Sequence, residues 1–147
     1  MSEDDEDSDY RYHVRLVIRH PTMTPDFITK KLKLVPHLNW TAGRPRKAPN
    51  GNLLRGRSKE TVWGYHRYTE RKRAFFEDVV ALIDVLEPHA NFLQEIVDSG
   101  GRMFIALDLV GDTNIGDALS YQQLARLSAL RIDLSVEVFP RMKSYDS

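Results

Sequence analysis

Apolar and polar positions alternate near both ends of the chain, and a period of two predicts β-strands. In YRYHVRLVIRH (10–20), Val14, Leu16 and Ile18 alternate with charged or polar residues, which is typical of a half-buried strand. A final strand is expected before the C-terminus, because four apolar residues there fall on one face: Ile132, Leu134, Val136 and Val138.

Two further stretches read as more deeply buried strands. TVWGYHRYT (61–69) carries aromatic residues at both odd and even positions, which indicates a central strand with two buried faces. RMFIALDLV (102–110) is an apolar run interrupted by Asp108. Alternation places Asp108 on the face opposite Ile105 and Leu107, so we expect its carboxylate to be exposed.

A helix is predicted between the first two strands, in TPDFITKKLKLVP (24–36). Thr24 is the expected N-cap, Pro25 the first helical residue, and Asp26 an acid in the positive first turn. The apolar face comprises Phe27, Ile28 and Leu32, and Pro36 closes the segment.

The strongest helical pattern lies in RAFFEDVVALIDVLEPHANFLQEIVDSGG (73–101). Its leading apolar residues recur at helical spacing: Phe75, Val79, Leu82 and Leu86. Pro88 is expected to end or kink this helix, and a second helix follows up to Gly100–Gly101. A last helix begins with Ser120 and Gln123 as a capping box and leads into the final strand.

The order β-α-β-α(α)-β-α-β predicts an α+β (or α/β) two-layer sandwich. We expect a sheet of four or more strands with helices packed on one face. Two segments also match without gaps: Met23-Thr24…Ile28…Lys30 and Leu119-Ser120…Leu124…Arg126. This echo allows two ferredoxin-like pseudo-repeated halves.

A length of 147 residues fits one domain. We expect a single globular domain over residues 11–140, a disordered acidic tail over 1–10 and a short C-terminal tail over 141–147. The absence of cysteine excludes disulfides, thiolate metal sites and cysteine nucleophiles. The start of the chain is acidic, unlike a signal peptide, and no apolar run approaches the ~20 residues that span a bilayer. A cytoplasmic protein without a membrane partner is expected.

Periodicity disappears between His37 and Lys59, where glycine and proline recur. Connections of this length are uncommon in compact domains, and they are usually functional, mobile, or contain a short hairpin. Asn50–Gly51 is a turn signal, and the NLL that starts at Asn52 could be a return strand.

The formal net charge of zero results from two opposed local charges. Residues 1–9 carry six acids and no base, whereas residues 40–73 carry ten bases and two acids, a local charge of +8. The ten bases are Arg44, Arg46, Lys47, Arg55, Arg57, Lys59, Arg67, Arg71, Lys72 and Arg73.

In the order and length of its elements, the chain resembles a known family. The features in common are the opening strand, TPDFITKKLKLVP, a tryptophan-bearing strand preceded by Gly43, a two-part helix ending near Gly101, and a capped helix before LRIDLSVEVF. Together they resemble the bacterial domain-of-unknown-function family numbered 4279, over roughly Tyr12 to Phe139. The resemblance implies a fold but no activity, and the acidic tail and the basic segment are not features that it implies.

No arrangement of side chains in the sequence is a recognised catalytic or metal motif. The five histidines include no HExxH, no HxH and no helical i, i+4 pair. The carboxylates Glu77 and Asp78 are expected on the solvated face of the long helix, and Asp117 fits turn chemistry better than a calcium loop. We expect no cofactor, no metal and no catalytic residue. An enzyme that uses His66 with the arginines of the basic segment is the minor hypothesis.

The aromatic-flanked basic segment 39–68 is the candidate functional surface. Our leading interpretation is a non-catalytic binding or interaction module that meets a protein or a small ligand there. The alternative is a nucleic-acid or polyanion binder, in which the bases contact phosphates, tryptophan or tyrosine stacks on bases, and the acidic tail competes. A solvated loop with its tryptophans in the core is a third interpretation. The candidate binding residues are Arg44, Arg46, Lys47, Arg55, Arg57, Trp63, Tyr65 and His66. The oligomeric state is open, with a dimer as one option.

Overall fold

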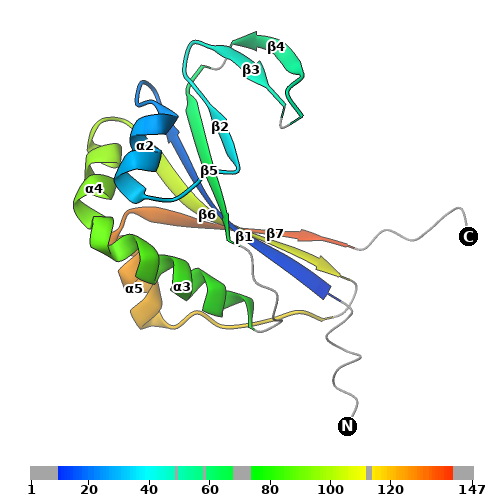
Figure 1. Cartoon of the computed structure of the whole chain (residues 1–147). Coiled ribbons are helices and arrows are strands. Elements are labelled where there is room, and N and C mark those ends of the chain that lie inside the picture. Colours follow the sequence, from blue (N-terminus) through cyan, green and yellow to red (C-terminus); the bar gives the residue numbers. More distant parts are fainter. Residues whose placement is uncertain (1–9, 49, 58, 68–73, 112–113, 141–147) are drawn as a thin grey trace, which may run out of the picture.

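The computed structural model describes residues 10–48, 50–57, 59–67, 74–111 and 114–140 (Figure 1). The predicted tails, 1–10 and 141–147, lie outside the described residues apart from Tyr10. The elements are β1 (Tyr10–His20), α2 (Pro25–Leu32), β2 (Leu38–Trp40), β3 (Pro45–Lys47), β4 (Leu53–Arg57), β5 (Thr61–Arg67), α3 (Phe75–Leu86), the 3-10 helix η1 (Glu87–His89), α4 (Ala90–Asp98), β6 (Arg102–Gly111), α5 (Tyr121–Ala129) and β7 (Ile132–Phe139).

Five strands form one mixed sheet in the order β2-β5-β1-β6-β7. β5 lies inside the sheet, as its aromatic residues predicted. β1 is antiparallel to β5 and β6, whereas β6 and β7 are parallel. The α+β sandwich is therefore confirmed, but two similar halves are not found. The strands that flank α2, β1 and β2, are separated by β5, which is antiparallel to both. The strands that flank α5, β6 and β7, are adjacent and parallel, so the two halves differ in topology.

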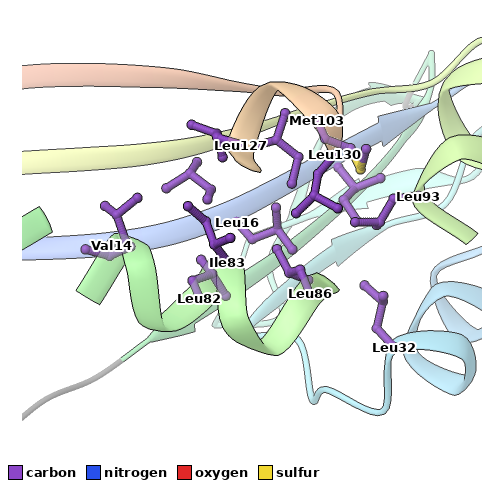
Figure 2. Packing of buried hydrophobic residues seen from close by; sticks show 14 of the residues in the cluster. Val14, Leu16, Leu32, Leu82, Ile83, Leu86, Leu93, Met103, Leu127 and Leu130 are labelled. Carbon is purple, nitrogen blue, oxygen red and sulfur yellow. The ribbon is translucent and has the colours of Figure 1, made fainter. Parts of the chain in front are cut away.

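The α-helices lie on one face of the sheet and enclose the core with it (Figure 1). In Figure 2, Val14 and Leu16 of β1 lie against Leu82 and Leu86 of α3, and all four side chains are buried. Trp63 of β5 belongs to the same core and donates its indole N–H to Thr29 Oγ1 at 2.9 Å. Each large apolar side chain buried in this way contributes about 1.5–3 kcal/mol, so the alternation along the strands determines which face the helices cover.

The helix ends follow their predicted signals. Thr24 Oγ1 accepts from the backbone N–H of Phe27 at 3.3 Å, and α2 ends where Lys33 takes a left-handed φ of 59°. Ser120 caps α5 in the same way, although Gln123 Oε1 accepts from Arg126 rather than completing a capping box. Pro88 lies in η1, between α3 and α4, so the predicted interruption of the long helix is confirmed.

The segment without periodicity contains three short strands. β3 and β4 form a separate two-stranded hairpin that projects at one end of the sheet (Figure 1). The turn is closed by the N–H of Ala48, which donates to Asn52 O at 2.8 Å, and Gly51 supplies a φ of 91°. The return strand suggested by Asn50–Gly51 is β4. β2, which was not predicted, extends the main sheet by pairing with β5.

Candidate functional site

The sheet face opposite the helices carries most of the charged side chains of the strands. We call it the open face, because no helix covers it within the described part of the chain (Figure 1). Its members follow from the register, which sets Arg15 beside His66 and Arg19 opposite Arg102. Val17 and Val62 also lie on this face and are nevertheless buried. Longer neighbouring side chains therefore fold over them and form a surface with apolar and charged parts.

A basic groove lies where the open face meets the hairpin. It is a cavity of about 220 Å³, lined by Arg19, Trp40, Arg46, Arg57, Lys59, Glu60 and Val62. The lining residues come from the C-terminal ends of β1 and β4, from β3, from the paired strands β2 and β5, and from the connection into β5. A second cavity of about 380 Å³ shares Trp40 and is lined by Arg44 and Lys47 among others.

Hydrogen bonds hold the hairpin against β2. Trp40 donates its indole N–H to Lys47 O at 2.6 Å, and Arg57 donates to Gly43 O at 2.8 Å. The guanidinium of Arg46 lies over the Trp40 ring, 5.5 Å from its centroid, which is within the range of a cation–π contact. Arg46 and Arg57 are thus positioned before any ligand arrives.

Among the described residues that line the groove, one is a carboxylate, Glu60, and two arginines share it. Glu60 Oε1 lies 3.3 Å from a terminal guanidinium nitrogen of Arg19 and 3.3 Å from one of Arg102. Glu60 therefore offsets the charge of Arg19 and Arg102, which lie side by side on β1 and β6. Cationic side chains held close together beside low-dielectric walls produce a positive potential that attracts anions.

Three histidines form a row across the open face. The ring centroid of His66 lies 4.9 Å from that of His13 and 5.3 Å from that of His37. His37 reaches the row because Gly64 leaves room, since a Cβ there would stand 3.2 Å from His37 Cε1. Burial lowers the pKa of both His37 and His66, and the charge of nearby Arg15 lowers both pKa values further. These two imidazoles are neutral at pH 7 and add no positive charge there.

The surroundings of His66 bear on the minor enzyme hypothesis. Arg15 and Asp108 are its charged neighbours, but they pair with each other at 3.2 Å. Asp108 is therefore ion-paired on the open face rather than simply solvated. Among the residues that the structure describes, no group of three or more His, Asp or Glu side chains could hold a metal ion. What this face offers chemically is charge and hydrogen-bond donors.

Asp78 departs from its predicted place. It was expected on the solvated face of the long helix, yet it is 1% exposed. The hydroxyl of Tyr12 donates to its Oδ2 at 2.7 Å, and Arg67 Nε lies 3.8 Å from its Oδ1. A carboxylate buried among such partners serves packing between α3 and the sheet. It lies on the helix-covered face, away from the open face.

The predicted binding residues divide between the two faces. Arg44, Arg46, Lys47 and Arg57 come together around the two cavities. Arg55 lies in β4, with its side chain outside the described residues, and His66 lies on the open face.

The two aromatic candidates of β5 lie on the other side of the sheet. Trp63 is 0% exposed, and alternation along β5 turns it toward the helices and away from the groove. Tyr65 shares that face, with its ring centroid 6.4 Å from that of Trp63 and 17° between the planes.

The sequence did not predict that Arg19 and Arg102 belong to the site. Arg19 is a polar position in the alternation of the first strand, which assigns it a face but not a neighbour. Arg102 lies beside Arg19 only because of the register of β1 with β6. Both residues are identified by pairing between strands that are far apart in the sequence.

The sheet with helices on one face and a basic hairpin at its end defines an α+β two-layer domain with a charged open face. The chain belongs to the family described as domain of unknown function DUF4279, whose model matches residues 10–139. Neither a curated protein nor a solved structure matches the chain. Within the described residues, no helix is both long enough and apolar enough to cross a bilayer.

Proposed function

We propose that this domain is a non-catalytic binding module and that its basic groove receives an acidic segment of a partner protein. The composition of the groove supports the proposal, since its described lining residues include four cationic side chains and one carboxylate. That carboxylate, Glu60, is already shared by Arg19 and Arg102. A bacterial cytoplasmic location, expected from the sequence and the resemblance, is part of the same proposal.

Acidic side chains suit this groove for a geometric reason. Arginine presents its donors in a planar fork that matches a carboxylate, and such charge-assisted hydrogen bonds are about twice as strong as neutral ones. Arg46 and Lys59 come from different sides of the cavity, one from β3 and one from the connection into β5. An extended segment with several carboxylates could therefore contact both at once.

Nucleic acid is the alternative ligand, and the positions of the aromatic residues count against it. Single-strand binders add base stacking to phosphate contacts. Trp63 is in the core, Tyr65 lies on the helix-covered face, and one side of the Trp40 ring faces Arg46. A nucleic acid would therefore gain phosphate contacts here but little base stacking, so an acidic peptide, which needs no stacking, is the favoured ligand.

Fluorescence anisotropy tests the proposal with three labelled probes: a short polyglutamate peptide, a single-stranded RNA of equal charge, and a DNA duplex. The intact chain and a form without residues 1–9 would be titrated over a range of salt. We expect the peptide to bind most tightly, with affinity that falls as salt rises. Lys59→Glu should weaken it about tenfold, because one charge-assisted contact is worth about 1.5 kcal/mol or more.

The matched control is Lys30→Glu, which makes the same change of charge at an exposed position of α2, on the helix side. It should change the affinity for the peptide less than twofold, roughly the effect of a distant surface charge. Tighter binding of RNA than of peptide would support the alternative function. If no probe binds at low salt, the groove is not an anion site and the proposal is wrong.

A further inference from the structure

We propose that β7 pairs with β7 of a second copy of this chain, antiparallel and about a two-fold axis at Val136. The two five-stranded sheets would then form one continuous sheet across a dimer. This inference is independent of the basic groove, which lies at the opposite edge of the sheet, beside β2.

The edge formed by β7 is unprotected. β7 pairs with β6 on one side, and no strand is hydrogen-bonded to its other side among the described residues. Natural sheets usually shield an edge with charged side chains, above all lysine, or with a proline, a bulge or a very short strand. The only charges of β7 are Asp133 and Glu137, both on the open face. β7 has eight residues with no lysine, arginine or proline, and its register with β6 is unbroken from Ile132 to Phe139. The opposite edge, β2, has only three residues.

The apolar side chains of β7 are only partly covered. Leu134, Val136 and Val138 pair in register with Ile105, Leu107 and Leu109 of β6, and so lie on the same face as those core residues. Yet Val136 is 51% exposed and Val138 is 61% exposed, because the second half of β7 extends past α5 (Figure 1). Exposed valines on an open strand edge are a typical surface for strand addition.

The register follows from side-chain parity and charge. Residues opposite each other across an antiparallel pair lie on the same face. In a symmetric pair one residue must therefore stand opposite its own copy, and the two-fold axis passes midway between the two; an axis at a residue means this arrangement. An axis at Ser135 would place Asp133 opposite Glu137 twice, and an axis at Glu137 would place that carboxylate opposite its own copy. Like charges directly opposite each other are destabilising.

Only the axis at Val136 gives a long ladder without facing carboxylates. An axis at Leu134 would pair few residues, because the chain turns at Arg131, which has a φ of 61°. An axis at Val136 pairs residues 133–139 of both copies. Val136 then faces its own copy, Leu134 faces Val138 and Ser135 faces Glu137.

A hollow at the edge of the sheet fits the same register. It has a volume of about 550 Å³ and lies between α5 and β7, with Leu124, Leu127 and Leu134 among its lining residues. Because Val138 of the second copy would stand opposite Leu134, its side chain would enter the mouth of this hollow. Such an interface is isologous, so each copy supplies both the valine and the hollow. The self-complementarity is what selects a second copy as the partner.

Sedimentation equilibrium of the full chain over a wide concentration range tests the association. We expect a monomer–dimer equilibrium for the natural chain and monomers alone for Val136→Lys, which places two ammonium groups opposite each other. The control is Val35→Lys, which changes another exposed valine (82% exposed) away from the sheet edge and should leave the equilibrium unchanged. Circular dichroism checks that both variants are folded.

Cross-linking tests the register. The chain has no cysteine, so Val136→Cys introduces a single thiol. Directly opposite residues have Cα atoms about 4.5 or 5.5 Å apart, within the range of a disulfide. Mild oxidation should therefore link Val136→Cys into covalent dimers, whereas Val138→Cys, on the same face but far from its own copy, should not link. A natural chain that stays monomeric, a dimer that survives Val136→Lys, or preferential linking of Val138→Cys would each overturn the proposal.

Discussion

His20 is a buried residue whose hydrogen bonds determine its protonation state. Its Nδ1 accepts from the backbone N–H groups of Thr22 and Met23 at 3.0 and 2.8 Å, and its Nε2 lies 2.8 Å from Ser99 Oγ. Since Nδ1 accepts two N–H donors, the proton of the neutral ring is on Nε2. Gly101 packs so closely against the ring that a Cβ there would stand 2.8 Å from His20 Cδ2. The end of β1 is thereby tied to the end of α4.

The stability of the chain should depend on pH through this residue. Burial lowers the pKa of His20 below the ordinary histidine value of about 6.5. Below that value the unfolded chain binds more protons than the native one, so the free energy of unfolding falls as pH drops toward the native pKa. His20→Phe should cost about 1–3 kcal/mol at neutral pH, because two partly buried N–H groups lose their acceptor.

Urea denaturation of the natural chain and His20→Phe, at about pH 7.5 and about pH 5.5, measures this dependence. The difference between the two proteins should be smaller at the lower pH, because protons bind His20 more readily in the unfolded natural chain, and His20→Phe lacks this loss of stability. His37 and His66 contribute with the same sign in both proteins, so they cancel in the comparison. A difference that grows as pH falls would contradict the assignment.

At the scale of elements, the long periodic segments were predictable and the short ones were not. α3 and β1 have enough residues to show a period, and Thr24 and Ser120 supply local caps. β2 has three residues, too few for a period, and exists because β5 offers it a partner. The same distinction between predictable and unpredictable features applies to the residues of the groove. Composition predicted the bases of the hairpin, whereas the approach of Arg19 and Arg102 depends on strand register.

The N-terminus of α3 is capped from a distant loop. Ala74, at its N-cap, makes no side-chain cap hydrogen bond. Asp117 supplies the missing acceptor, because its Oδ2 accepts from the backbone N–H of Phe76 at 2.9 Å. A carboxylate at this end of a helix also interacts favourably with the helix dipole. The turn chemistry expected for Asp117 is present as well, since its Oδ1 accepts from the N–H of Ala118 at 2.8 Å.

Removal of this cap should destabilise the whole domain, because α3 forms much of the core. We expect Asp117→Ala to lower the free energy of unfolding by about 0.5–2 kcal/mol, the usual cost of losing a cap, and Asp117→Asn by less. Thermal and urea denaturation provide the measurement. Gly116→Ala is the control in the same loop, since its Cβ would meet nothing within 4 Å. Equal effects of Asp117→Ala and Gly116→Ala would show that the loop, and not the cap, matters.

At the scale of the whole molecule, the basic groove and the β7 edge lie at opposite sides of one sheet. A two-fold axis perpendicular to the sheet keeps both open faces on the same side. The proposed dimer would therefore present a basic hairpin at each end of a ten-stranded surface. Neighbouring strands are about 4.8 Å apart, so the two outermost strands would be separated by roughly 40–45 Å.

Ligand length should then matter in the dimer alone. An extended acidic peptide of about 30 residues is long enough to reach both grooves, since each residue spans about 3.3 Å, whereas a peptide of about eight residues is not. If both proposals hold, the long peptide should bind the natural chain at least about tenfold more tightly than it binds Val136→Lys, through the effective concentration of the second groove. The short peptide should bind both proteins equally.

Because Val136→Lys adds positive charge, a loss of affinity cannot arise from weaker general attraction. Anisotropy titrations with the two peptides, and Val35→Lys as the control, decide the matter. An equal response to both lengths would mean that the two surfaces act independently.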